Sequence, residues 1–198
     1  MCHKKVNILR FASLVIAIAV LLSALGGLNV FAAQEGTCGK DLKWSYSGTT
    51  LTIKGSGAMK NYNEVNKAPW YKYKDQITTV ILPEKLESIG ILSFYDCTSL
   101  KSVVIPNNVK SIGDKAFYNC TGLRTVVFGS GLKSIGRAAF YKCEKLASVT
   151  FPNSLEKIGD KAFYFCSSIV TLTIPEGVKS LGKQAFTYCE SLLRVEIK

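Results

Sequence analysis

The chain repeats itself every 23 residues, and this repeat limits its fold more than any other feature of the sequence. Five cysteines keep this interval: Cys97, Cys120, Cys143, Cys166 and Cys189. Six apolar columns run in register with them, one of which is Phe94, Phe117, Phe140, Phe163 and Phe186. One such unit cannot bury its apolar side alone, whereas stacked units share a continuous core. The chain is therefore expected to be a solenoid.

Two local patterns predict the structure of each unit. Residues 102–105 alternate, so that Val103 and Ile105 point inward, and a proline or glycine follows each copy. Successive copies are expected to form a parallel sheet with about 4.8 Å between coils. The segment 113–118 is expected to form a short helical turn, with Asp114 in its first turn. The fold class is thus a repeat solenoid with a parallel β-sheet and short helical turns.

The region before the repeats predicts a β-hairpin cap. Apolar residues alternate on both sides of a turn at 47–48: Leu42, Trp44 and Tyr46, then Leu51 and Ile53. We expect residues 33–64 to form this cap and residues 65–198 to form the solenoid, with one degenerate and five recognisable coils. In the degenerate coil, Trp70 and Tyr71 fall in the columns of Ala116 and Phe117.

The N-terminus has the pattern of a secretory signal peptide over residues 1–32. Lys4, Lys5 and Arg10 precede the apolar run 11–25, and Val30-Phe31-Ala32 provides a small-x-small cleavage site after Ala32. The alternative is an uncleaved membrane anchor, because residues 11–28 are nearly long enough to span a bilayer. With cleavage, the chain is expected to be secreted or surface-exposed and not bound to a membrane.

The charge balance points to anionic partners. The 25 Lys and Arg residues less the three in 1–32 leave 22, against 14 Asp and Glu, for a net charge of +8. Acidic glycans, teichoic polymers and acidic proteins fit this charge, and export argues against nucleic acid. The alternative is that the lysines are solvated coil edges.

The repeat unit Ile-Gly-x-x-Ala-Phe-x-x-Cys-x-x-Leu-x-x-Val-x-Ile-Pro resembles the BspA-type bacterial leucine-rich repeat over residues 71–198. The front region also resembles the N-terminal module of that family. Its matching residues are Cys38-Gly39, Leu42, Trp44, Leu51-Thr52-Ile53, Gly55, Gly57-Ala58-Met59 and Pro69-Trp70-Tyr71. The resemblance implies that the solenoid is a leucine-rich-repeat right-handed coil. It also implies a bacterial surface or secreted protein, with an adhesin-like role toward extracellular proteins or glycans such as those of the host matrix. A structural, self-assembling role and carbohydrate binding are the alternatives.

The sequence argues against catalysis and against a metal or other cofactor. His3 is the sole histidine and lies in the predicted signal peptide, so His-dependent triads and His-ligated zinc are excluded from the mature chain. No phosphate-binding glycine loop or carboxylate cluster is present. We therefore expect a binding scaffold and not an enzyme.

The five repeat cysteines are expected to form a buried structural ladder of free thiols. Each lies between a core phenylalanine and a core leucine, where a small apolar side chain belongs. Side chains in a parallel ladder point the same way, which disfavours the disulfide torsion. An even cysteine count in a secreted chain leaves a disulfide framework as the alternative.

Two columns are candidate binding surfaces. The first is an aromatic stripe next to the core phenylalanines: Tyr95, Tyr118, Tyr141 and Tyr164, followed by Thr187. The second is the outward column of the strands: Ile81, Val104, Val127, Thr150, Thr173 and Glu196. Either surface could bind a protein or a sugar. The alternatives are that each tyrosine packs over the neighbouring coil, and that the strand column is ordinary surface.

The last coil, residues 180–198, ends without a recognisable cap. Its strand is expected to be an edge, with Arg194, Glu196 and Lys198 as charges against uncontrolled pairing. Fraying or weak self-association of this coil is therefore expected.

Overall fold

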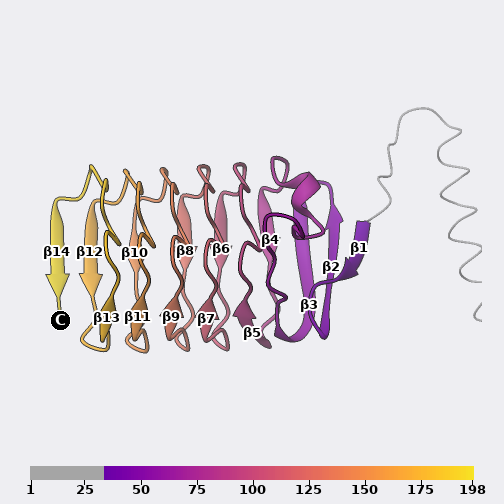
Figure 1. Ribbon diagram of the computed structural model, residues 1–198, viewed down its shortest axis with the longest axis horizontal. Coiled ribbons are helices and arrows are strands. Elements are labelled where there is room, and N and C mark those ends of the chain that lie inside the picture. The colour runs from indigo at the N-terminus through magenta and orange to yellow at the C-terminus, as the bar shows by residue number, and fades with distance from the viewer. Residues whose placement is uncertain (1–33) are drawn as a thin grey trace, which may run out of the picture. The chain divides into compact units, whose positions relative to one another are not determined.

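The computed structural model describes residues 34–198, which form one solenoid of stacked coils (Figure 1). The predicted signal peptide and its cleavage site lie outside the described residues. Each coil contributes one rung to each of two parallel β-ladders, and the apolar columns fill the space between them. The predicted solenoid is confirmed.

The first ladder contains the strands that the alternating pattern predicted. It consists of β4 (Thr79–Ile81), β6 (Ser102–Val104), β8 (Thr125–Val127), β10 (Val149–Thr150), β12 (Thr171–Ile174) and β14 (Arg194–Ile197). Neighbouring strands pair in parallel with a 23-residue offset, as in Val103 with Val126. The ladder is thinnest between β8 and β10, where a single bridge joins Thr125 to Ser148.

A second parallel ladder was not predicted. It consists of β5 (Leu86–Ile89), β7 (Ser111–Ile112), β9 (Ser134–Ile135), β11 (Lys157–Ile158) and β13 (Ser180–Leu181). Four of these strands have only two residues, of which β7, β9 and β11 each bury one isoleucine, so they show no alternation that a sequence could reveal. The Ile column, here Ile112 and Ile135, is the buried row of this ladder.

The segments expected to be helical turns are non-helical. Lys115 and Asn119 both have positive φ, of 53° and 58°, and the same two positions are left-handed in every coil from Leu92 to Tyr188. This backbone turns alternate N–H groups toward the next coil, so that Phe117 N donates to Ala139 O at 2.7 Å. A helix would use those donors within its own turn. The turns thus add a third row of hydrogen bonds between coils.

Asp114 does not serve a helix N-terminus. Its Oδ1 accepts a hydrogen bond from the main-chain N–H of Arg137 in the next coil, at 2.8 Å. Asp160 repeats the contact with Lys183 N at 2.7 Å. Both carboxylates therefore stabilise the stacking of coils.

The predicted hairpin is present, and it closes both ladders at once. β2 (Asp41–Ser47) and β3 (Thr50–Ala58) are antiparallel, and β1 (Gln34–Thr37) adds an unpredicted third strand. The start of β3 pairs with β4 and its end pairs with β5. β3 bends between these partners at Gly55, where φ is 110° and a Cβ would lie 1.9 Å from Asp41 O. A side chain at position 55 is therefore incompatible with this bend.

The degenerate coil is shifted by one residue from its predicted alignment. Trp70 stacks on Phe94 with centroids 5.9 Å apart, and Tyr71 lies 6.5 Å from Tyr95. Trp70 therefore occupies the phenylalanine column and Tyr71 the tyrosine column. A short 3-10 helix, η1 (Tyr71–Tyr73), accommodates the extra residue before Ile77 rejoins the common register.

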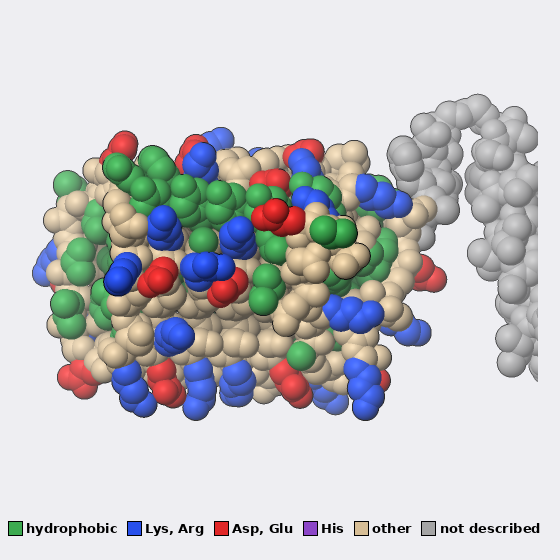
Figure 2. All heavy atoms as spheres, in the orientation of Figure 1, with side chains coloured by type: hydrophobic (Ala, Val, Ile, Leu, Met, Phe, Trp, Pro, Cys, Tyr) green, Lys and Arg blue, Asp and Glu red, His purple; other side chains and the backbone are tan. Residues whose placement is uncertain are grey.

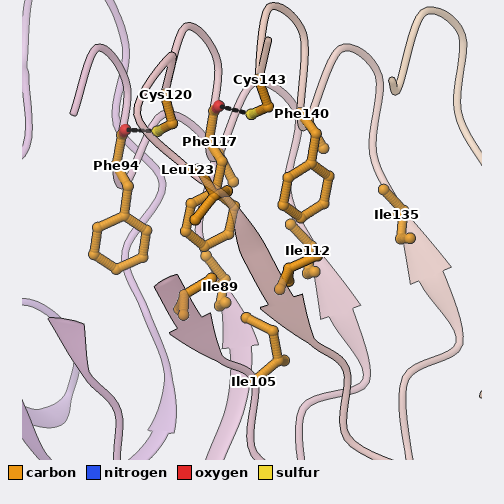
Figure 3. Close-up of a cluster of buried hydrophobic side chains, with 14 of the residues drawn as sticks. Ile89, Phe94, Ile105, Ile112, Phe117, Cys120, Leu123, Ile135, Phe140 and Cys143 are labelled. Carbon is orange, nitrogen blue, oxygen red and sulfur yellow. Dashed lines mark hydrogen bonds between the residues drawn. The ribbon is translucent and has the colours of Figure 1, made fainter. Parts of the chain in front are cut away.

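The core is a continuous stack of aromatic and aliphatic columns. Phe117 and Phe140 are fully buried and stack with centroids 5.1 Å apart, above Ile89, Ile105 and Ile112 in the view of Figure 3. The same columns are more open in the last coil, where Val195 is 52% and Ile197 is 82% exposed.

Candidate functional site

The repeat cysteines occupy the buried side of the turns. Cys97, Cys120, Cys143, Cys166 and Cys189 are all buried, and none forms a disulfide. The thiols of Cys120 and Cys143 donate to the carbonyl oxygens of Phe94 and Phe117, one coil back, at 3.2 and 3.3 Å (Figure 3). The column thus combines a small apolar side chain with a weak donor.

Burial keeps these thiols in their neutral form. Desolvation raises the pKa of Cys97 to about 12 and that of Cys189 to about 11, and it holds the pKa of Cys143 well above its ordinary value. A thiolate is the reactive form of cysteine, so this column is unsuited to nucleophilic chemistry.

The tyrosine column forms one stacked row, here called the aromatic ladder: Tyr71, Tyr95, Tyr118, Tyr141 and Tyr164. From Tyr95 onward the ring centroids are 5.1, 4.7 and 5.1 Å apart and the interplanar angles are between 3° and 10°. Each ring is half-buried. A band of hydrophobic side chains follows the stacking direction over the turns after β5 to β13 (Figure 2).

The stacking determines which part of each ring a binding partner can contact. Parallel neighbours cover the ring faces, so the edges and the hydroxyl groups face outward. Desolvation, the nearby Asp96 carboxylate and the adjacent tyrosines raise the pKa of Tyr95 and Tyr118, so their hydroxyls remain protonated donors at neutral pH.

Two further aromatic residues join the ladder, and the sequence reasoning missed them. Phe165 and Tyr188 stack on each other at 4.6 Å, and both lie edge-to-face against Tyr164. Their backbones are left-handed, with φ of 59° and 60°. The same column holds Asp96 and Asn119 in earlier coils. The change from these polar residues to aromatic ones is the signal that could have identified Phe165 and Tyr188 from the sequence.

Lysine side chains lie close to the aromatic rings in most of the coils. Lys67 Nζ lies 4.2 Å from the Tyr71 centroid, and Lys115 Nζ lies 5.9 Å from that of Tyr118. Lys142 and Lys161 lie 5.9 and 5.6 Å from Phe165 and Tyr164, respectively. These distances fall within the range of cation–π contacts.

The outward strand column lies on a different ladder and has two parts. Val104 and Val127 are 62% and 50% exposed on β6 and β8, beside the equally open Ile81. Thr150 and Thr173 continue the column and line a hollow of about 730 Å³ over β10 and β12. The hollow is also lined by Ser148, Thr171, Asn153, Glu176 and Lys198.

The described residues contain neither a cluster suited to a metal site nor a helix suited to spanning a membrane. Across residues 34–198, no three His, Cys, Asp or Glu side chains come together as a metal site would require. In the same range, no helix is both long and apolar enough to cross a membrane.

Comparison with known proteins places the chain in a family. The family model for the BspA-type leucine-rich repeat region matches six copies over residues 65–193, which is more than half of the chain. A search of curated protein sequences found no significant match.

Solved bacterial structures share the fold. A leucine-rich repeat protein of Eubacterium ventriosum is 28% identical, with a TM-score of 0.74 over 84% of this chain and 44% of that one. The Treponema pallidum leucine-rich repeat protein is 31% identical, with a TM-score of 0.60 over 80% of this chain and 70% of that one. The chain thus spans less than half the length of the first of these. Its repeat match and this shared architecture establish that it belongs to the BspA-type leucine-rich repeat family.

Proposed function

We propose that the protein is a secreted or surface-exposed scaffold that binds another extracellular protein in an adhesin-like role. In this proposal residues 33–64 form the cap, residues 65–198 form the binding solenoid, and the aromatic ladder with Phe165 and Tyr188 is the contact surface. Partners of host-matrix type fit the family, while nucleic acid and membrane lipid are not expected.

The position of Phe165 and Tyr188 carries this proposal. A left-handed backbone costs a residue other than glycine or asparagine roughly 1–2 kcal/mol, and asparagine already serves this turn at position 119. The fold therefore gains nothing in backbone energy from aromatic rings at these positions. Exposed aromatic residues are typical of the centres of protein interfaces, which gives them a reason to be there.

The orientation of the rings favours a protein over a sugar. Carbohydrates bind aromatic residues by lying on the ring face, and the neighbouring rings cover the faces of Tyr118 and Tyr141. Edges and hydroxyl groups instead suit side chains and main-chain carbonyl oxygens of a polypeptide.

Carbohydrate binding remains a second candidate, at the hollow over β10 and β12. The outward hydroxyls of Ser148, Thr150, Thr171 and Thr173 form no side-chain hydrogen bond within residues 34–198. A row of free hydroxyls beside Asn153 and Glu176 offers hydrogen-bonding groups to a polar ligand. Self-association through the open C-terminal coil is a third candidate, supported by the exposure of Leu193 and Ile197.

A solid-phase panel of purified extracellular-matrix proteins and glycans tests the proposal with variants taken from the repeat itself. Tyr118→Thr with Tyr141→Thr introduces the residue found at position 187. Val104→Thr with Val127→Thr introduces the residue found at positions 150 and 173. We expect the first variant to lose about tenfold or more in affinity for a matrix protein, and the second to bind normally. Binding that depends on the valine pair, or that is confined to glycans, would overturn the proposal.

A further inference from the structure

The charged groups around the aromatic ladder differ in how far they are already engaged in contacts within the protein. The carboxylates nearest to it are already engaged: Asp96 accepts from Tyr71 Oη and Asn119 Nδ2, and Asp114 and Asp160 accept main-chain N–H groups. The lysines are less engaged. Lys67, Lys142 and Lys161 form no ion pair among residues 34–198, and Lys115 has one exposed contact of 3.7 Å to Glu64. Lys67, Lys142 and Lys161 are therefore the charged groups beside the ladder that are most available to a partner.

The outward edges of the rings have the same electrostatic sign as these lysines. An aromatic ring carries partial negative charge on its faces and partial positive charge at its edge. Because the rings from Tyr95 to Tyr164 stack in parallel, their faces are covered and their edges point outward. The protonated hydroxyls of Tyr95 and Tyr118 add hydrogen-bond donors to this surface.

Phe165 and Tyr188 add an apolar contact at the end of this positive row. Phe165 is half-buried and Tyr188 is exposed, and the two stack on each other against Tyr164. A partner that uses the whole surface needs acidic groups for the lysines and apolar groups for these two rings. An acidic polysaccharide supplies the first without the second, whereas a peptide supplies both.

We propose that the aromatic ladder, with Lys142, Lys161, Phe165 and Tyr188, binds an acidic peptide segment of the partner protein that also carries apolar side chains. This inference rests on the proposed function and adds the chemical class of the segment. Complementary charge speeds the encounter and fixes orientation, while the aromatic pair supplies the buried contact.

Fluorescence anisotropy of the protein with a short dye-labelled peptide of alternating glutamate and leucine tests the inference. We expect saturable binding that weakens with added salt, because these charges are exposed to screening. The same peptide with glutamine in place of glutamate is expected to bind about tenfold or more weakly. Equal binding of the two peptides, or no binding of either, would overturn the inference.

Variants copied from other coils locate the site. Lys142→Asn with Lys161→Gln introduces the residues found at positions 119 and 184, and it should weaken peptide binding by about tenfold. Lys54→Gln with Lys110→Gln removes the same charge elsewhere and should leave binding unchanged. Phe165→Asn with Tyr188→Asn should also lose binding while the melting temperature is retained, since asparagine suits a left-handed backbone. A peptide that binds all variants equally does not use this surface.

Competition separates the possible failures. Heparin that binds at the ladder while the glutamate peptide does not would make the ligand a polysaccharide and end the inference. If the peptide fails but the Tyr118→Thr and Tyr141→Thr variant still loses its matrix protein, the proposed function stands and the acidic character of the partner is wrong. If that variant keeps its matrix protein, the proposed function is itself wrong.

Discussion

The thiol of Cys143 donates a hydrogen bond to the main-chain carbonyl oxygen of Phe117, 3.3 Å away and one coil back. Cys166 and Cys189 make the same contact with Phe140 and Phe163. A residue at this position must be small enough for the core, and from Cys120 onward it must also offer a donor to the neighbouring coil. Cysteine meets both requirements, which explains why it recurs in a column that contains no disulfide.

Replacing Cys143 with alanine is expected to lower the free energy of unfolding by ~1–2 kcal/mol, because a buried sulfur and its hydrogen bond are both lost. Urea denaturation measures this change. Thiol titration provides the control: native protein should react slowly, and unfolded reduced protein should show all its thiols. Fast reaction of the native ladder cysteines would contradict their burial.

Stability is expected to fall at alkaline pH. The folded-state pKa of Cys97 is raised by burial to about 12 from its ordinary value of 9.0. A thiol with a raised pKa contributes its full stability below pH 9, and this contribution is lost as the pH rises toward 12. Urea midpoints measured from neutral to alkaline pH should decline above 9, and Cys97→Ala should decline less steeply. Identical slopes for the two proteins would show that Cys97 does not titrate as described.

Phe140→Ala is expected to be far more damaging than Tyr141→Ala. Phe140 is fully buried between Phe117 and Phe163, so its truncation should cost ~3–5 kcal/mol. Tyr141 is half-buried, so its truncation should lower the free energy of unfolding by clearly less. Equal shifts in a urea melt would mean that the inner and outer aromatic columns are assigned wrongly.

Glycine substitutions at adjacent alanines test the left-handed turns. Ala138 has a φ of 51°, so Ala138→Gly relieves strain and should be neutral or stabilising. Both alanines are buried, but Ala139 has no positive φ and so no strain to relieve, and Ala139→Gly should cost roughly 1–2 kcal/mol from lost burial and added chain entropy. A larger loss at position 138 than at 139 would be inconsistent with the described turn.

The sequence predicted the features that depend on side-chain burial. The columns of Phe117, Val103 and Cys120 were assigned inward because a stacked core requires them there, and the hairpin followed from its alternation and turn. It could not distinguish helical turns from the observed ones. Both bury Ala116 and Phe117. The first left-handed position of each turn holds Leu92, Lys115, Ala138, Lys161 or Gln184, none of which is a turn signal, and only Asp96 and Asn119 at the second position favour this backbone.

Three features of the fold and of the candidate site depend on contacts between coils. The one-residue shift at Trp70 follows from an insertion before Ile77, which periodicity does not locate. Phe165 and Tyr188 resemble ordinary substitutions in a variable column until their left-handed backbone and mutual stacking are known. The tyrosine stripe was predicted as a column, whereas its edge-outward orientation required the interplanar angles.

Hydroxyl-radical footprinting of the protein, with and without a bound matrix protein, tests the assignment of the binding surface most directly. The aromatic ladder should be the protected region, so oxidation of Tyr118, Tyr141 and Tyr164 should fall on binding. Tyr73, which stacks on Tyr46 of the cap at 4.2 Å, should be oxidised equally in both states. Unchanged oxidation of the three ladder tyrosines in a saturated complex would contradict the account.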